Sequence, residues 1–162
     1  MAKVVERPEV DLYERDFAAW ARKQAELLQA RRFEELDLDH LIEEVADLGV
    51  SERNAVLNRT RIILEHFLQL EYSPAKNPRR GWEETLITQR SDLEVILSPS
   101  LQRDLERDLA KIYARARRDA AKGLRRDRVE EDSLPGSCPY PIAQILDPDW
   151  LPTNRHGLRD EG

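Results

Sequence analysis

The sequence predicts an all-α protein, a single-domain helical bundle of about five main helices with an irregular, proline-containing C-terminal segment. Apolar residues recur at 3.6-residue spacing along most of the chain. Of the 162 residues, 36% are charged and only 6 are glycine, which is typical of a helical bundle with a charged surface. Strands would need more Val, Ile, Thr and Tyr than the chain contains.

Capping residues and helix breakers define the ends of the expected helices. Asp11 and Asp37 are good N-caps, and Ser98 followed by Pro99 is typical of a helix start. Gly49 is expected to end the second helix. The five expected main helices cover residues 11–31, 37–49, 51–72, 82–97 and 98–123.

After residue 123 the helical pattern gives way to charge and proline, and only residues 142–146 are expected to form another short helical turn. Trp150 and Leu151 are large enough to anchor this segment to the bundle. One domain is therefore expected over residues 11–152, with flexible termini at 1–10 and 153–162. The expected core contains Trp20, Leu41, Leu64, Phe67, Leu86, Leu93, Leu105 and Ile112.

Charge and hydropathy limit the partners. The formal net charge of −6 argues against attraction of the whole surface to nucleic acid. No window approaches the ~20 apolar residues of a membrane span, and the N-terminus lacks an apolar secretion signal, so we expect a cytoplasmic protein with no membrane partner. Cys138 is the only cysteine, which excludes an intrachain disulfide and a cysteine-rich zinc site.

Several polar residues lie on or beside apolar helix faces. An unpaired charge in a core is costly, so Glu44 or Asp108 is expected to meet Arg90 or His66. Two interpretations remain open: an internal ion pair that fixes which helices are neighbours, and a polar pocket with perturbed acids and bases. The candidate set is Glu44, His66, Gln89, Arg90 and Asp108.

The sequence contains no cofactor or catalytic signature. It has no phosphate-binding glycine loop, dinucleotide fingerprint or nucleophile elbow, so no cofactor is expected. It also has no Glu-x-x-His pair. The nearest approach to a metal motif is Asp37, His40 and Glu44 on one short helix, where Asp37 is better explained as an N-cap, so no metal site is expected. Whether the chain is an enzyme stays open.

A basic cluster lies near the end of the fifth expected helix. A solvated helix end explains it, because cations are favoured near a helix C-terminus. The alternative is a site for nucleic acid or an acidic partner; the lack of interleaved aromatic residues and the acidic run at residues 130–132 argue against nucleic acid. The cluster consists of Arg115, Arg117, Arg118, Lys122, Arg125, Arg126 and Arg128.

Scattered short motifs occur in a fixed order: Trp20, Leu36-Asp37, Glu43-Glu44, His66-Phe67-Leu68, Trp82 with Gln89-Arg90, Ser98-Pro99-Ser100-Leu101 and Cys138-Pro139-Tyr140. Their order and spacing resemble the bacterial family catalogued as domain of unknown function 29, from about residue 13 to 152. The resemblance implies an all-helical domain with no assigned chemistry and supplies no catalytic residue. The family looks to have Lys where this chain has Gln69, which puts in doubt any role that needs a cation there.

These features favour a non-catalytic, cytoplasmic helical protein-interaction module that acts through a protein partner, including as one half of a regulatory or toxin–antitoxin-like pair. The alternative is an uncharacterised enzyme or nucleic-acid effector with a polar site built from Glu44, His66 and Arg90. The oligomeric state is left open by the sequence.

Overall fold

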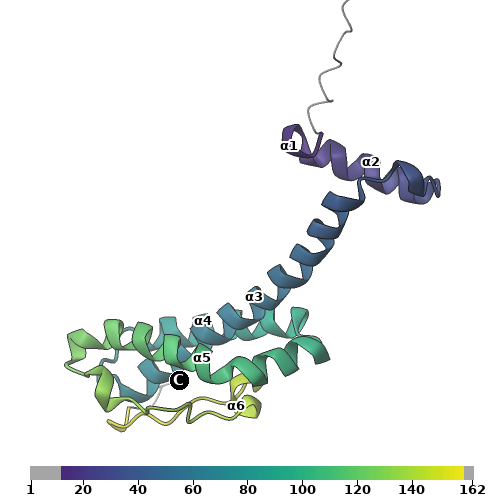
Figure 1. The fold of residues 1–162 in the computed structure, drawn as a ribbon. Helices are drawn as coiled ribbons and strands as arrows, with labels where there is room; N and C mark the ends of the chain where they lie inside the picture. Colours follow the sequence, from purple (N-terminus) through teal and green to yellow (C-terminus); the bar gives the residue numbers. More distant parts are fainter. Residues whose placement is uncertain (1–11, 159–162) are drawn as a thin grey trace, which may run out of the picture. The chain divides into compact units, whose positions relative to one another are not determined.

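The computed structural model describes residues 12–158 (Figure 1). Over these residues the chain is helical and contains no strand, which confirms the predicted all-α class. Its contacts divide it into two compact units, Met1–Val50 and Ser51–Gly162, called here the N-terminal and C-terminal units. The prediction of one domain over residues 11–152 concerns how these units fold together, and it stays a prediction. The expected cap at Asp11 and the segment 1–10 lie outside the described residues.

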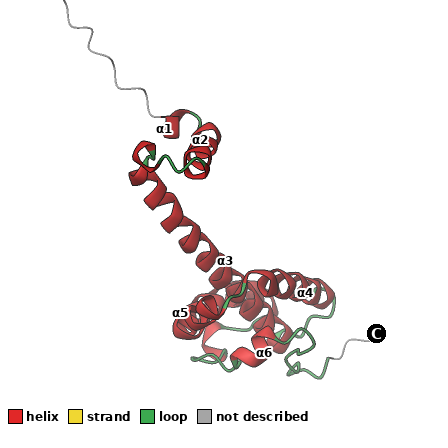
Figure 2. Ribbon diagram, turned by 90° about the vertical axis from the view of Figure 1, so that its right-hand side faces the viewer, coloured by secondary structure: helices red, strands yellow, loops and turns green. Residues whose placement is uncertain are grey.

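The N-terminal unit contains α1 (Leu12–Arg15), α2 (Phe17–Gln29), the 3-10 turn η1 (Phe33–Glu35) and the first part of α3 (Leu38–Tyr72). The helix expected over residues 11–31 is therefore interrupted at Asp16. The Asp16 Oδ1 accepts a hydrogen bond from the Ala19 N–H at 2.9 Å, so this residue caps α2. The loops of this unit are visible in Figure 2.

The two helices expected over residues 37–49 and 51–72 form one helix, α3, so the prediction that Gly49 ends a helix is wrong. A glycine that ends a helix usually adopts a left-handed conformation, and within the described chain Gly157 is the glycine with positive φ. A glycine inside a helix costs only about 1 kcal/mol relative to alanine, so good helix formers on both sides outweigh it. Asp37 caps α3 as predicted, because its Oδ1 accepts from the His40 N–H at 3.4 Å.

The C-terminal unit is a bundle made of the second part of α3, α4 (Arg79–Ile96) and α5 (Pro99–Leu124) (Figures 1 and 2). The start of α5 is as predicted, since the Ser98 hydroxyl accepts from the Leu101 N–H at 3.4 Å and Pro99 occupies the first turn. α4 begins three residues earlier than expected. A short helix, α6 (Ile142–Leu146), forms where the sequence predicts a helical turn.

The core of the C-terminal unit lies between these helices. It buries six of the residues expected in a single core: Leu64, Phe67, Leu86, Leu93, Leu105 and Ile112. Trp20 is buried too, but it belongs to the N-terminal unit, and Leu41 is only half-buried. The core of the C-terminal unit therefore contains six of the eight residues predicted for a single core, and the other two belong to the N-terminal unit.

The chain after α5 follows an irregular path through the 3-10 turns η2 (Arg125–Asp127) and η3 (Glu131–Ser133) to α6 and beyond. Asn154 is 6% exposed and its amide donates to the carbonyls of Leu70 at 2.7 Å and Ser73 at 2.9 Å. Asn154 thus connects the C-terminal segment to the end of α3, and the flexibility expected from residue 153 stays a prediction. Trp150 packs on the core as predicted, whereas Leu151 is 39% exposed. In the described chain no helix combines the length and apolar character needed to cross a membrane.

Candidate functional site

Arg90, the most buried of the candidate polar residues, ties α4 to the C-terminal segment. Its guanidinium donates to the carbonyls of Gln144 at 2.8 Å, Ile145 at 3.0 Å and Trp150 at 2.9 Å, and it lies 5.0 Å from the centre of the Phe67 ring. Burial lowers the pKa of Arg90. The predicted carboxylate partner is wrong, because main-chain oxygens satisfy this buried cation instead.

Glu44 and His66, which the sequence grouped with Arg90, each have a local partner. The Tyr13 hydroxyl donates to Glu44 at 2.5 Å, and this bond raises the pKa of Tyr13 to about 12. The His66 Nδ1 lies 3.0 Å from the Ile62 carbonyl, and burial lowers the pKa of His66. The three residues therefore have separate sets of partners, each within its own unit.

Gln89 and Asp108, the other candidates, take part in contacts between helices of the C-terminal unit. The Gln89 Oε1 accepts from Arg59 at 3.2 Å, and Arg59 also pairs with Asp92 at 2.6 Å. Asp108 forms an ion pair with Arg53. Ion pairs that fix helix neighbours therefore do form, but they join arginines of α3 to carboxylates of α4 and α5.

A groove lies between α3 and α5 on the C-terminal unit, with a volume of about 470 Å³. Leu57, which packs against the core, and Ile112, which is 7% exposed, give it an apolar floor. Asn54 and Asn58 add side-chain amides on the α3 rim. The groove thus combines an apolar floor with polar edges, as ligand and peptide sites commonly do.

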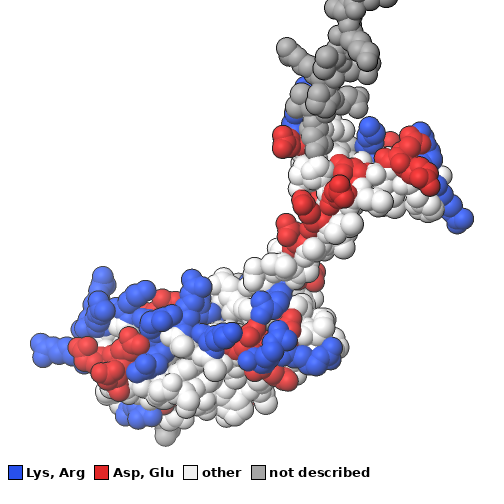
Figure 3. All heavy atoms as spheres, in the orientation of Figure 1, with Lys and Arg blue, Asp and Glu red and all other residues white. Residues whose placement is uncertain are grey.

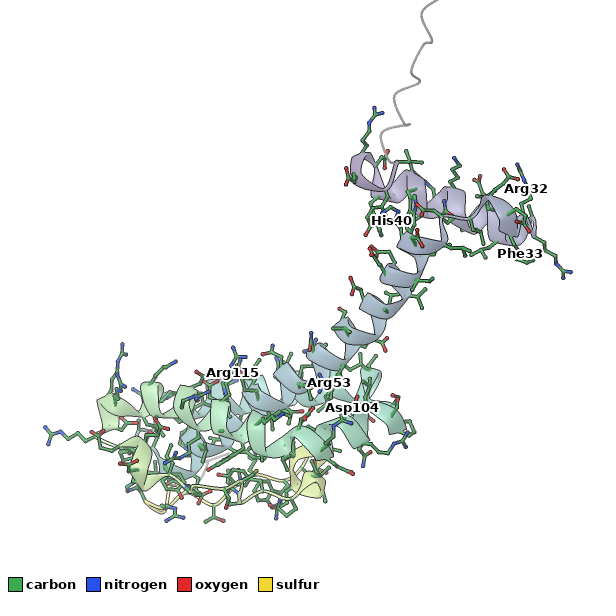
Figure 4. The ribbon with its side chains drawn as sticks, in the orientation of Figure 1. Arg32, Phe33, His40, Arg53, Asp104 and Arg115 are labelled. Atoms are coloured by element: carbon green, nitrogen blue, oxygen red, sulfur yellow. The ribbon has the colours of Figure 1, made fainter. Side chains whose placement is uncertain are left out.

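Ion pairs hold the two rims of the groove together. Arg53 pairs with Asp108, and its Nε lies 3.5 Å from the Asp104 carboxylate. Figure 4 shows Arg53 and Asp104 on facing helices. The Arg61 guanidinium lies 2.8 Å from Asp119. These pairs fix the spacing of α3 and α5 and neutralise two of the groove's cations.

Two further groove cations, Lys111 and Arg115, are exposed and have no hydrogen-bond or ion-pair partner among residues 12–158. Arg118 continues the row, because spacings of four and three residues lie on one helix face. Figure 3 shows Lys and Arg side chains gathered over α5. The basic cluster predicted from the sequence begins at Arg115 and does not include Lys111. The four-residue spacing between Lys111 and Arg115 is a signal that could have identified it.

The predicted basic cluster divides into two kinds of residue. Arg117 points away from the groove row, and its Nη2 donates to the Glu131 carbonyl at 2.7 Å, so it fixes η3 to α5. Lys122 pairs with Asp119 at 3.2 Å. The remaining members are exposed and lie along α5 or just beyond it: Arg115, Arg118, Arg125, Arg126 and Arg128.

The described chain gives little support to three other kinds of site: a metal site, a nucleophilic cysteine and a second cavity. No group of three His, Cys, Asp or Glu side chains between residues 12 and 158 could hold a metal ion. The half-buried Cys138 thiol lies 3.5 Å from the Tyr140 carbonyl, and burial raises its pKa, which disfavours the nucleophilic thiolate. A second cavity of about 410 Å³ adjoins α4 and α6, but Arg90 on its wall is already bound to main-chain carbonyls.

The fold and the groove define an all-helical protein with a basic surface groove on its C-terminal unit. A family model described as "Domain of unknown function DUF29" matches residues 12–151, and the chain belongs to this family. The match confirms the resemblance drawn from the scattered motifs. No curated protein and no solved structure matches the chain.

Proposed function

We propose that the chain is a non-catalytic, cytoplasmic helical interaction module whose groove between α3 and α5 binds an acidic peptide segment of a protein partner. The observation that carries the proposal is the apolar floor of the groove beside two exposed cations without partners, Lys111 and Arg115. In a regulatory or toxin–antitoxin-like pair, this segment belongs to the second protein.

The chemistry of the groove suits carboxylates combined with an apolar side chain. Leu57 and Ile112 provide a contact surface for an apolar anchor. Arg115 offers a planar guanidinium that can bind a carboxylate through two parallel hydrogen bonds. Carboxylates neutralise Arg53 and Arg61, so Lys111 and Arg115 supply the positive charge that attracts an acidic partner.

The same groove suits nucleic acid less well. No aromatic side chain lines it, so bases have no surface on which to stack. The missing stacking surface therefore favours a peptide, which needs only an apolar anchor and carboxylate side chains.

A direct binding measurement tests the proposal. Two fluorescein-labelled helical peptides are compared by anisotropy with the full chain, one with Leu at every third or fourth position and Glu elsewhere, the other with Lys in place of Glu. We expect the acidic peptide to bind and the basic peptide not to bind. The variant Lys111→Glu/Arg115→Glu should weaken binding of the acidic peptide by about tenfold or more, since it reverses the charge of the rim.

The matched control is Arg125→Glu/Arg126→Glu, which makes the same change in net charge at exposed residues outside the groove lining. This control should weaken binding by less than about twofold. Equal losses in the two variants, or no binding of the acidic peptide, would contradict the proposal. Tighter binding of single-stranded RNA than of the acidic peptide would favour the nucleic-acid effector instead.

A further inference from the structure

Large apolar side chains are exposed along the first part of α3. Leu38, Ile42, Val45 and Leu48 are 55%, 66%, 66% and 67% exposed. Spacings of four, three and three residues put them on one face of the helix, with Leu41 beside them. We call these five residues the apolar stripe.

Within residues 12–50 the apolar stripe is uncovered, because α1 and α2 contact another face of α3. Tyr13 donates to Glu44 and stacks on His40 with ring centres 3.9 Å apart. The Trp20 Nε1 donates to Asp37 at 2.9 Å. Polar and aromatic contacts therefore join the helices of this unit. Figure 3 shows acidic side chains on one side of these turns of α3 and uncharged surface on the other.

Two small residues, Ala46 and Gly49, lie on or beside the apolar stripe. A Cβ atom added at Gly49 would meet nothing within 4 Å, so packing within the described chain does not require a glycine there. Small residues on an apolar helix face allow the backbone of another helix to approach closely. They therefore indicate that the occupant of this face is a helix.

The exposed apolar surface is as large as a specific interface needs. At about 180 Å² for a large apolar side chain, the four most exposed stripe residues leave on the order of 450 Å² of apolar surface per chain. A standard interface buries about 800 Å² per partner, of which roughly 450 Å² is apolar.

We propose that two copies of the chain pair through the apolar stripe, so that the first part of α3 from one copy packs against the same segment of the other copy. A two-fold axis lets the same apolar helix face meet itself. A second copy is present whenever the chain is present, so it covers an apolar patch that would otherwise promote aggregation. This inference does not depend on the groove of the C-terminal unit.

The acidic residues of the N-terminal unit are compatible with this pairing. The first 50 residues carry 13 Asp and Glu against 7 Lys and Arg, which accounts for the whole formal charge of −6. Asp39, Glu43 and Asp47 follow one another at four-residue spacing, about 100° to 180° around the helix from Leu38. Pairing through the apolar stripe therefore leaves these carboxylates in solvent, where salt screens their repulsion.

The test is the mass of the full chain in solution by sedimentation and light scattering. We expect a dimer, at twice the chain mass of 18.9 kDa. Ile42→Glu and Val45→Glu should each raise the dimer dissociation constant by about 100-fold or more, because each dimer then buries two carboxylates in an apolar contact. Both side chains are mostly exposed in the single chain, so these substitutions leave its fold intact, which circular dichroism checks.

The matched control is Val95→Glu, which introduces the same charge at an apolar residue of α4 that is 84% exposed. This variant should remain dimeric. A wild-type chain that is monomeric at 100 µM, as a face kept for a different protein would give, overturns the inference. A dimer that persists in both stripe variants, or one that Val95→Glu disrupts equally, overturns it as well.

Discussion

The two units of the chain handle their apolar residues in opposite ways. The C-terminal unit buries most of its large apolar side chains, with Phe67, Leu105 and Ile145 fully enclosed. Trp20, Gln24 and Leu27 are the buried residues of α1, α2 and η1 within the described chain, and the first part of α3 adds none. Charge differs too, since Ser51–Gly162 carries 19 basic and 19 acidic residues and is neutral overall.

This difference explains how each unit is held together. In the N-terminal unit a buried polar side chain connects two helices. The Gln24 Oε1 of α2 accepts a hydrogen bond from the Asp37 N–H at 2.9 Å and so helps to cap α3. In the C-terminal unit apolar packing sets the helix positions, and ion pairs such as Arg59 with Asp92 fix which helices are neighbours. A unit with so small a core is poorly suited to fold alone, which agrees with a role in assembly.

The largest expected effect on stability comes from replacing a phenylalanine by alanine, a change that can be made in both units. Phe67→Ala should lower the free energy of unfolding by about 3 to 5 kcal/mol, because it leaves a cavity beside Tyr140 and Trp150. Phe33→Ala removes a ring that is 57% exposed in η1 and should cost less than about 1 kcal/mol. Urea denaturation of both variants measures the difference. Similar losses in the two would break the comparison.

A smaller effect is expected at Arg90. Arg90→Lys keeps the charge but cannot reproduce the planar set of donors that reach three carbonyls of the C-terminal segment. We expect a loss of about 2 kcal/mol, with faster amide hydrogen exchange over residues 142–158. Arg80→Lys is the control, because the Arg80 side chain is 90% exposed. Unchanged exchange in Arg90→Lys would show that apolar contacts alone hold the segment.

The smallest effect is a pH dependence that belongs to the C-terminal unit. Burial lowers the pKa of His66 below the ordinary 6.5, so the unfolded chain binds this proton at higher pH than the folded chain does. The stability from neutral His66 is complete above pH 6.5 and falls as the pH decreases towards the folded-state pKa.

Denaturant unfolding from pH 7.5 to 5.5 measures this dependence, and His66→Gln should flatten it. The range stops at pH 5.5 because burial raises the pKa of the neighbouring Glu65 above its ordinary 4.5, and protonation of Glu65 changes stability in the opposite direction. An equally steep profile in His66→Gln would assign the dependence to another group.

Local signals predicted most of the helix boundaries. Ser98 and Pro99 start α5, Asp37 caps α3, and residues 142–146 form a helix, because capping and the restraints of proline depend on a few neighbouring residues. Gly49 misled the prediction because its cost of about 1 kcal/mol is a local preference that a long helix overrides. Lys111 was not predicted as a site residue, because it lines a groove whose other side is formed by α3 residues distant in sequence.

The sequence by itself determined that the chain is all-α, where most helices start, and which family the chain belongs to. Helical periodicity identifies an apolar face, but it does not reveal whether another part of the chain covers that face. Only the tertiary structure decided that the faces of Leu64 and Leu105 are buried while that of Ile42 is exposed. It also decided that Arg90 binds carbonyls more than 50 residues away and that α3 and α5 form a groove. Such contacts join residues distant in sequence, and the free energy that selects among them depends on the packing of the whole unit.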